Sequence, residues 1–233
     1  MLELKKVQTS YLQSQVLFGI DLDINAGEVV TLIGRNGMGK TTTIHSIMGI
    51  VRANLGKIIF EGNLIKDWPS YRIAKAGIGL VPEGRQIFPN LSVYENLIAT
   101  ASNRFSNSNQ WTLNRIFELF PNLGNRSRQM GSQLSGGEQQ MLAISRALMT
   151  NPKLLILDEA TEGLAPMVRK EIWDCLKELK SAGQSILIVD KNIEALSGIA
   201  ERHFIIEKGK VVWSGTSETL RKNKQIQNRY LCI

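Results

Sequence analysis

Short apolar runs alternate with longer helical segments along most of the chain, which is the pattern of an α/β fold. Within several of these runs, among them Ile186–Val189, apolar residues follow one another without polar alternation. Such a run indicates a strand that is buried on both faces of a sheet. The predicted strands cover residues Leu2–Val7, Val16–Ile24, Val29–Ile33, Lys57–Phe60, Gly79–Val81, Leu154–Leu157, Ile186–Val189, Phe204–Ile206 and Val211–Trp213.

Residues 90–149 interrupt this alternation, because they contain almost no strand-like run. Helical segments are predicted there over Val93–Ala101, Trp111–Leu119 and Glu138–Met149. This block is therefore expected to be a helical subdomain that is inserted into an α/β core. We expect a single domain over residues 1–233, in which residues 1–89 and 150–233 form the core.

Composition narrows the class of protein. The chain has 233 residues, of which 43% are hydrophobic, so it can fill a substantial core. No apolar run approaches the roughly 18 residues that a membrane span needs. The start of the chain lacks the apolar stretch of a signal peptide, and we expect a cytoplasmic protein. Cys175, Cys232, His45 and His203 are too few and too scattered to predict a metal site of Cys and His ligands.

The net charge of +7 and the pI of about 9.5 allow an anionic partner. Nucleic acid is not the expected one, because the basic residues are scattered and aromatic residues make up only 6% of the chain. The densest basic group lies in a polar C-terminal stretch that is typical of a solvated helix face. Its members are Arg221, Lys222, Lys224 and Arg229.

The segment Gly34–Thr42, GRNGMGKTT, fits the pattern G-x-x-x-x-G-K-[ST] between a predicted strand and a predicted helix. In this pattern, glycines let backbone N–H groups curl around phosphates, and the helix N-terminus adds a positive dipole. Lys40 would reach the β- and γ-phosphates, and the Thr41 hydroxyl would bind Mg²⁺. The candidate nucleotide-binding residues are Asn36, Gly37, Gly39, Lys40, Thr41 and Thr42.

The segment Leu154–Ala160, LLILDEA, is an apolar strand that ends in two carboxylates. In P-loop proteins a carboxylate at this position holds Mg²⁺ together with the loop hydroxyl, so Asp158 is the expected metal partner of Thr41. Glu159 could orient or deprotonate the attacking water. Without a phosphate loop, the same acidic pair would favour a helix cap.

The segment Leu134–Leu148, LSGGEQQMLAISRAL, resembles the signature sequence of ATP-binding-cassette (ABC) ATPases. Ser135 with Glu138 also fits a helix-capping motif, which is compatible with the functional interpretation. The resemblance covers essentially the whole chain and implies a P-loop NTPase fold: a RecA-like core, an antiparallel β subdomain and the inserted helical subdomain. It implies ATP and Mg²⁺ as ligands, and it places Ser135, Gly136 and Gly137 against the ATP of a second subunit.

The resemblance implies further roles for single residues. Tyr11 matches the aromatic residue that stacks on adenine. Glu83 stands where most of these ATPases have a glutamine that senses Mg²⁺ and the membrane subunit, which makes it a candidate metal ligand beside Thr41 and Asp158. The segment Thr161–Pro166 matches the dimer-contact loop, in which Ala165 replaces the usual aspartate.

Several segments together, including VPEGRQIFPNLSVYENL and TEGLAP, resemble the ATPase subunits of branched-chain amino acid uptake systems. This implies a second ATPase subunit, with a heterodimer expected and a homodimer possible. It also implies a separate membrane permease, an extracytoplasmic binding protein, and a location on the cytoplasmic face of the inner membrane. The alternatives are the ATPase of a urea or short-amide importer, a soluble ABC ATPase without a transporter, and a regulatory module that has lost turnover.

The resemblance places the segment Ile186–Asn192, ILIVDKN, next to LLILDEA in the sheet, so that its C-terminal end is expected to face the γ-phosphate. Most ABC ATPases have histidine at the position of Lys191, and the branched-chain group commonly has glutamine. Lys191 could donate to the γ-phosphate, pair with Glu159 and lower the pKa of that carboxyl, or turn to solvent. The candidate catalytic residues are therefore Lys40, Glu159 and Lys191, with the role of Lys191 left open among these three.

Overall fold

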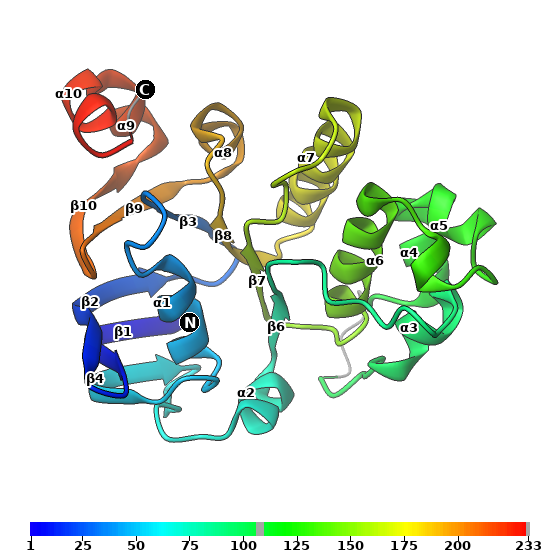
Figure 1. The fold of residues 1–233 in the computed structure, drawn as a ribbon, viewed down its shortest axis with the longest axis horizontal. Coiled ribbons are helices and arrows are strands. Elements are labelled where there is room, and N and C mark those ends of the chain that lie inside the picture. The colour runs from blue at the N-terminus through cyan, green and yellow to red at the C-terminus, as the bar shows by residue number, and fades with distance from the viewer. Residues whose placement is uncertain (106–109, 232–233) are drawn as a thin grey trace.

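The computed structural model describes residues 1–105 and 110–231. Cys232, one of the two cysteines, lies outside them. Figure 1 shows a molecule with a strand-rich part at the N-terminal end of the chain and a separate group of helices built from its middle. Among the described residues, none of the helices combines the length and the apolar character that crossing a bilayer requires.

The larger sheet has six strands and carries the core of the fold. Its central strands are parallel, and only the pair β9 and β10 at one edge is antiparallel. The carboxyl ends of the parallel strands therefore all lie on the same side of the sheet. The order across the sheet is β10 (Lys210–Thr216), β9 (Arg202–Glu207), β3 (Val29–Ile33), β8 (Ser185–Val189), β7 (Leu154–Asp158) and β6 (Ile78–Val81).

A second sheet of four antiparallel strands forms the β subdomain. The order is β2 (Ser14–Ile24), β1 (Leu2–Tyr11), β4 (Ala53–Phe60) and β5 (Asn63–Leu64). Each strand predicted from an apolar run is present, and most are longer than the run. The sequence analysis missed β5, because it has only two residues and both are exposed.

Successive residues of the buried strands point into two different hydrophobic clusters. In β7, Leu155 and Leu157 join the cluster that includes the helical block, whereas Leu154 and Ile156 join the cluster under the β subdomain. This period of two is hidden in the sequence, because both faces of the strand are apolar. A sheet covered on both faces explains why these strands read as continuous apolar runs.

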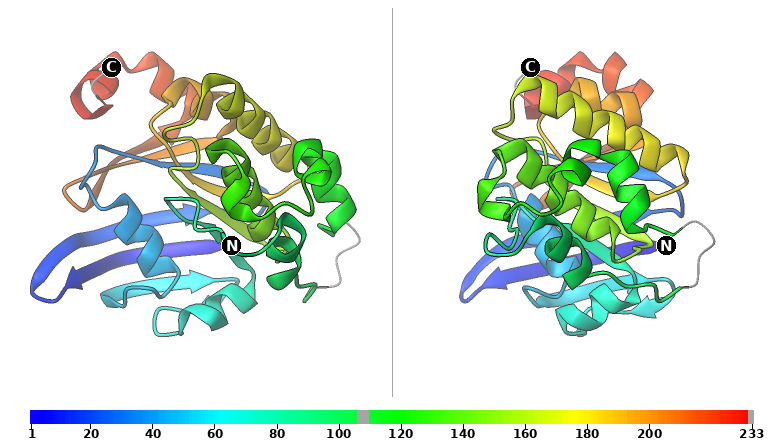
Figure 2. Two further views of the ribbon diagram at one scale, coloured as in Figure 1. Left: turned by 45° about the vertical axis from the view of Figure 1, so that its right-hand side comes forward. Right: turned by 90° about the vertical axis from the view of Figure 1, so that its right-hand side faces the viewer.

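The middle of the chain forms helices, as expected from its lack of strand-like runs. Figures 1 and 2 show α3 to α6 grouped beside the β6 edge of the larger sheet. Their helix α6 begins two residues before the predicted start, because Ser135 caps it at Gly136. The fold class is thus as predicted, while the division at residues 89 and 150 stays a prediction. The bounds are α3 (Val93–Ala99), α4 (Leu113–Leu119), α5 (Pro121–Asn125), a 3₁₀ turn (Gly131–Gln133) and α6 (Gly136–Leu148).

The remaining helices flank the two sheets (Figure 1). Three of them follow strands that lead to candidate site residues: α1 comes after β3, α7 comes after β7, and α8 comes after β8. The bounds are α1 (Lys40–Ile47), α2 (Ser70–Ala76), α7 (Pro166–Ser181), α8 (Ile193–Ile199), α9 (Ser217–Lys222), α10 (Lys224–Ile226) and a final π-helical turn (Gln227–Leu231).

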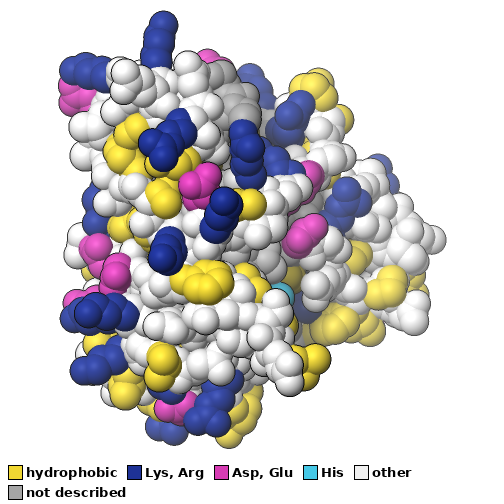
Figure 3. Space-filling model, turned by 60° about the vertical axis from the view of Figure 1, so that its left-hand side comes forward, with side chains coloured by type: hydrophobic (Ala, Val, Ile, Leu, Met, Phe, Trp, Pro, Cys, Tyr) yellow, Lys and Arg dark blue, Asp and Glu magenta, His cyan; other side chains and the backbone are white. Residues whose placement is uncertain are grey.

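The surface charge is dispersed on the face drawn in Figure 3. There, Lys and Arg side chains stand singly or in small groups among apolar, acidic and other residues, without forming one continuous stripe. The net charge of +7 is therefore not concentrated in a single basic track on this face.

Candidate active site

Three neighbouring parallel strands end at one edge of the larger sheet, and each is followed by a candidate site segment. β8 lies between β3 and β7. The phosphate loop Gly34–Gly39 follows β3, Asp158 ends β7, and Lys191 follows β8 by two residues. The carboxyl ends of parallel strands are where open α/β sheets bind ligands. The predicted adjacency of ILIVDKN and LLILDEA is confirmed.

The phosphate loop leads into α1 through Gly39, whose φ of 106° is in the region that favours glycine. A Cβ at Gly39 would also lie 2.8 Å from Leu17 Cδ2. Lys40 is 5% exposed, and its Nζ donates to the Arg35 carbonyl at 3.1 Å. The loop lines a cavity of about 440 Å³ with Val16, Asn36, Gly37, Gly39, Lys40, Thr41, Thr42, Glu83 and Glu159.

Asp158 and Thr41 form a unit that suits a divalent cation. Asp158 is 2% exposed and accepts a hydrogen bond from the Thr41 side chain. Burial raises the pKa of Asp158 above its ordinary value, and the Thr41 hydrogen bond opposes that rise. Its Oδ1 is buried without a hydrogen-bond partner in the structure. A buried carboxylate oxygen without a partner costs free energy, and hard oxygen atoms are what Mg²⁺ prefers, so the pair fits this ion.

Glu159 lies between two ammonium groups. Its Oε1 is 3.6 Å from Lys40 Nζ, and its Oε2 is 3.7 Å from Lys191 Nζ. Burial raises the pKa of Glu159 to about 7, with a further rise from the neighbouring Glu162 carboxyl, while the two lysines oppose it. A carboxyl with a pKa near neutral is suited to proton transfer at physiological pH.

The backbone of Glu159 is fixed in an uncommon conformation. Its φ is 50°, in the left-handed region that few residues other than glycine adopt. Its N–H donates to the Val189 carbonyl at 2.9 Å, which anchors the residue to the end of β8. Strained backbone of this kind is frequent at functional sites.

Glu83 lies close to the carboxylate of Glu159. Glu83, Glu159 and Glu162 each have an oxygen within 4.8 Å of the others. Glu83 is exposed at the rim of the nucleotide cavity, and its charge raises the pKa of Asp158. The structure thus brings Glu83 to the site, and its role as a metal ligand stays a prediction.

Lys191 meets a carboxylate that the sequence analysis did not single out. Its Nζ is 2.6 Å from Glu162 Oε1, which is much closer than Glu159 Oε2 at 3.7 Å. Of the three roles left open for Lys191, pairing with Glu159 is met in part: Lys191 acts to lower the pKa of Glu159, but the net pKa of that carboxyl is raised. The reason is that burial, the side-chain hydrogen bond with Glu162 and the Glu162 charge together outweigh both lysines. Glu162 lies in the TEGLAP segment, which resemblance alone assigned to dimer contact.

Asp190 is a second residue that the sequence analysis did not assign. It is 7% exposed, and its carboxylate accepts hydrogen bonds from the Thr161 hydroxyl and from the backbone N–H groups of Lys191 and Asn192. It joins the loop after β7 to the start of the segment that leads into α8. The only sequence signal was its place directly after a buried strand.

Ser135, Gly136 and Gly137 start α6 and are not among the residues that line the nucleotide cavity of this chain. Ser135 Oγ accepts from the Glu138 N–H at 3.3 Å, and the Ser135 N–H donates to Glu138 Oε2 at 2.8 Å, so the predicted capping motif is present. A Cβ at Gly136 would lie 2.5 Å from Arg85 Nη1, and one at Gly137 would lie 2.6 Å from Val168 Cγ1. Close packing against Val168 therefore favours glycine at position 137, whereas the neighbour at position 136 is the flexible end of the Arg85 side chain.

Tyr11 is the last residue of β1 and is 43% exposed. It pairs with Ser14 across the turn to β2. The residue from this subdomain that lines the nucleotide cavity is Val16. The stacking of Tyr11 on adenine stays a prediction.

Comparison with known proteins decides the family. A family model described as ABC transporter matches residues 17–162, which is more than half of the chain. The chain belongs to the ABC transporter family. The predicted resemblance is confirmed: this ABC ATPase binds a nucleotide and hydrolyses ATP, and members of the family act as dimers with membrane permease subunits.

The relatives of this ABC ATPase serve more than one kind of transport. It is 38% identical over 231 residues to the high-affinity branched-chain amino acid transport ATP-binding protein BraG of Pseudomonas aeruginosa, and the match covers 99% of each chain. It is 35% identical over 233 residues to the lipopolysaccharide export system ATP-binding protein LptB of Haemophilus influenzae, covering 99% of this chain and 97% of that one. It is 30% identical to the probable branched-chain amino acid transport ATP-binding protein LivF of Archaeoglobus fulgidus, covering 100% and 98%.

Solved structures agree with the assignment of the fold. One ATP-binding subunit of an ABC transporter superimposes with a TM-score of 0.84 at 26% identity, covering 100% of this chain and 96% of the other. The ATP-binding cassette MJ0796, in a dimeric post-hydrolysis state bound to ADP and Pi, gives a TM-score of 0.80 at 26% identity, covering 93% and 99%.

Proposed function

We propose that this ABC ATPase energises the uptake of branched-chain amino acids through a separate membrane permease. The observation that carries the proposal is the identity to BraG of 38% over 99% of both chains, with LivF as a second relative of the same kind. In this proposal the ATPase works on the cytoplasmic face of the inner membrane, and an extracytoplasmic binding protein delivers the solute.

Hydrolysis proceeds by attack of water on the γ-phosphorus, in line with the leaving oxygen. Lys40 binds the β- and γ-phosphates, while Thr41 and Asp158 hold Mg²⁺, which when bound neutralises phosphate charge. Glu159 accepts the proton of the attacking water, and its pKa of about 7 suits that role. Glu83 stands at the same cavity and is the third candidate ligand of the metal.

The second half of each ATP site comes from another subunit in this proposal. The first N–H groups of a helix lack partners within that helix and attract anions. The capped start of α6, at Ser135 to Gly137, presents such groups away from the nucleotide cavity of its own chain. We therefore assign these N–H groups to the γ-phosphate of the ATP that the partner subunit holds. In the proposed heterodimer, the partner is a longer ATPase of the same kind.

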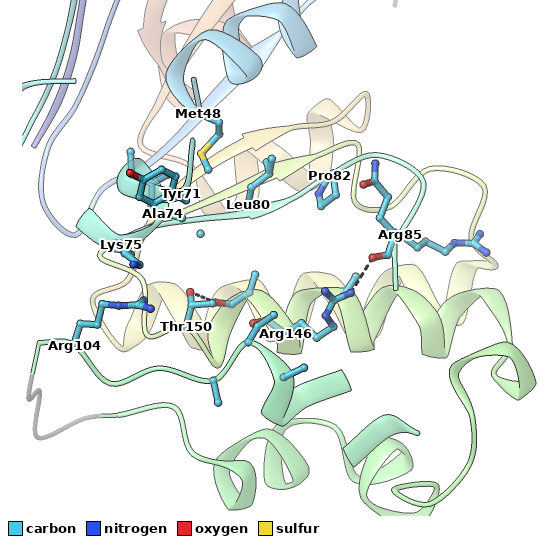
Figure 4. Close-up of a pocket in the computed structure, with 18 residues that line it drawn as sticks. Met48, Tyr71, Ala74, Lys75, Leu80, Pro82, Arg85, Arg104, Arg146 and Thr150 are labelled. Carbon is cyan, nitrogen blue, oxygen red and sulfur yellow. Dashed lines mark hydrogen bonds between the residues drawn. The ribbon is translucent and has the colours of Figure 1, made fainter. Parts of the chain in front are cut away.

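A cationic groove between the core and the helical block is the proposed docking site of the permease. It has a volume of about 570 Å³ and lies between β6 and α6 (Figure 4). Within the part of the chain that the structure describes, its lining residues include four cations, Lys75, Arg85, Arg104 and Arg146, and no Asp or Glu. Apolar side chains such as Leu80 also line it. These features favour a permease segment with both an apolar surface and a carboxylate.

Arg146 supports an acidic occupant most directly. Its Nη1 donates to the Gln86 carbonyl at 2.8 Å, and its guanidinium lies 4.1 Å from the centre of the Phe88 ring. Its Nε is buried and has no hydrogen-bond partner in the structure, and burial lowers the pKa of the group. A guanidinium that is partly desolvated gains most from a carboxylate brought by a partner.

The groove is tested by reversing charge at its exposed cations. Lys75→Glu with Arg104→Glu should abolish the stimulation of hydrolysis by permease while the rate of the isolated ATPase stays unchanged. The exposed Lys57 in β4 provides the matched control, Lys57→Glu, which should keep stimulation. Full stimulation of the groove variant would contradict this docking site.

A second candidate function is export of a lipopolysaccharide, and the 35% identity to LptB over 99% of this chain favours it. The two functions are separated by transport in proteoliposomes that hold the ATPase, its permease and its binding protein. We expect ATP-dependent uptake of radiolabelled leucine, isoleucine and valine but not of urea, and none with Glu159→Gln. ATP hydrolysis without uptake of any of the three amino acids would contradict the proposed solute and leave the ATPase assignment in place.

A further inference from the structure

Lys191 is held chiefly by Glu162. The distance of 2.6 Å from Lys191 Nζ to Glu162 Oε1 is that of a charge-assisted hydrogen bond. The distance of 3.7 Å to Glu159 Oε2 is that of an ion pair without a hydrogen bond. Glu162 raises the pKa of Lys191. The pKa of Glu162 is lowered first by its side-chain hydrogen bond with Glu159 and then by the hydrogen bond with Lys191.

Buried contacts fix the two segments that present this exposed pair. Asp190 binds the Thr161 hydroxyl on one side and the Lys191 N–H, at 2.7 Å, on the other. The Glu162 N–H donates to the Glu159 carbonyl at 3.2 Å, which closes the turn after β7. The Lys191 and Glu162 side chains therefore project from backbones that are tied to each other.

Glu159 separates two cavities, and the lysines approach it from different ones. The nucleotide cavity includes Lys40 but not Lys191 among its lining residues. The residues that line a neighbouring cavity of about 340 Å³ include Glu159, Glu162, Lys191 and Arg169. Lys40 faces Oε1 of Glu159 and Lys191 faces Oε2, so each oxygen has one ammonium nearby.

We propose that Glu162 is a positioning residue for ATP hydrolysis, which holds the Lys191 ammonium beside Glu159 and away from the γ-phosphate. Lys191 then acts on the reaction through Glu159, whose carboxylate it orients and whose charge it stabilises. The proposal rests on the ATPase activity and is independent of the transported solute. It selects one of the three roles that were open for Lys191 and adds Glu162 as the residue that makes this role possible.

A double-mutant cycle tests the proposal in the ATPase reconstituted with its permease. Glu162→Gln and Lys191→Met should each lower kcat about three- to tenfold and leave KM for MgATP within about twofold, because neither side chain binds the nucleotide. The double variant should be no slower than the slower single variant. Glu218→Gln breaks the exposed Lys222–Glu218 pair in α9, at 2.5 Å, and should leave kcat unchanged as a matched control.

A charge exchange distinguishes positioning from folding. The variant Glu162→Lys with Lys191→Glu restores an ammonium beside Glu159 from the opposite side of the pair. It should recover at least part of the kcat that Glu162→Gln loses. Thermal unfolding and the binding of a fluorescent ATP analogue should match the wild type for all of these variants.

Three results would overturn the proposal. One is a wild-type kcat for Glu162→Gln. Another is a double variant whose loss is the product of the two single losses, which would mean that the residues act independently. The third is a rise in KM on Lys191→Met that Glu162→Gln does not share, because it would place Lys191 on the phosphate.

Discussion

Two lysines flank the same carboxylate, but the protein holds them in different ways. Lys40 is 5% exposed, starts α1, and its Nζ donates to a carbonyl of its own loop. The side chain of Lys191 is 47% exposed and is held by Glu162 from another segment. Their distances to Glu159, 3.6 and 3.7 Å, are nearly equal.

The difference shows how a local motif and a tertiary contact can produce similar geometry. The phosphate loop places Lys40 through residues that are neighbours in the sequence, so the pattern alone predicts its position. Lys191 depends on the pairing of β7 with β8 and on two acids, Asp190 and Glu162. We therefore expect the two lysines to respond differently to substitution, to guanidinium replacement and to salt.

The largest effect is expected at Lys40. Lys40→Met should lower kcat about 10²- to 10³-fold, because it removes a fixed positive charge from the phosphates in a buried site. Steady-state hydrolysis of MgATP measures the loss, and Lys57→Met in β4 is the control on an exposed lysine. A loss no larger than that of Lys191→Met would remove the contrast between the two sites.

Replacement by arginine should affect kcat differently at the two lysines. Lys191→Arg should keep kcat within about twofold, since a guanidinium can still pair with Glu162 in an exposed position. Lys40→Arg should lose most activity, because a planar guanidinium on a longer side chain cannot reproduce the contacts of the buried Lys40 ammonium with the Arg35 carbonyl and with Glu159. Equal tolerance at the two positions would show that burial does not distinguish them.

Asp190 anchors the backbone of the segment that carries Lys191 and has no such contact with Lys40. Asp190→Ala leaves the Thr161 hydroxyl and two backbone N–H groups without their acceptor, which should cost about 1–3 kcal/mol in the free energy of unfolding. Asp190→Asn is the matched control, because its amide can accept from the N–H groups and donate to Thr161. Urea unfolding measures the stability of both variants, and we predict the large loss for the alanine variant alone.

The smallest expected effect is that of salt. The side chains of Lys191 and Glu162 are 47% and 51% exposed, so their attraction is screened at about 0.5 M salt, where the Debye length is about 4 Å. The kcat loss from Lys191→Met should shrink at that concentration, whereas the loss from Lys40→Met should not. Salt titrations of kcat for the two variants test this difference. Identical dependence on salt would contradict the view that the two lysines differ because of their burial.

Much of the fold could be predicted from apolar runs and motif spacing. Continuous runs such as Leu154–Leu157 located the buried strands, and the resemblance to ABC ATPases implied that ILIVDKN and LLILDEA lie side by side in the sheet. The strand β5 escaped prediction because two exposed residues carry no periodic signal. Helix boundaries shifted where a cap decides them, as Ser135 does for α6.

The contacts around Lys191 could not be predicted in the same way. Glu162 and Lys191 are 29 positions apart, and their pairing depends on side-chain directions set by a turn after β7 and a helix start after β8. Neither segment carries a pattern that names its partner. The pKa of Glu159 could not be predicted from the sequence either. Burial and the neighbouring Glu162 raise it, whereas two lysines lower it, and the balance depends on the tertiary structure.

The assignment of Glu159 is tested most directly by ATP turnover of Glu159→Gln in the reconstituted complex. Glutamine keeps the size of the side chain and one oxygen that can face a lysine, but its amide cannot accept the proton. We predict that kcat falls about 10²- to 10⁴-fold while the affinity for MgATP is retained. Hydrolysis at the wild-type rate would contradict the role of Glu159 and, with it, the role proposed for Glu162 and Lys191.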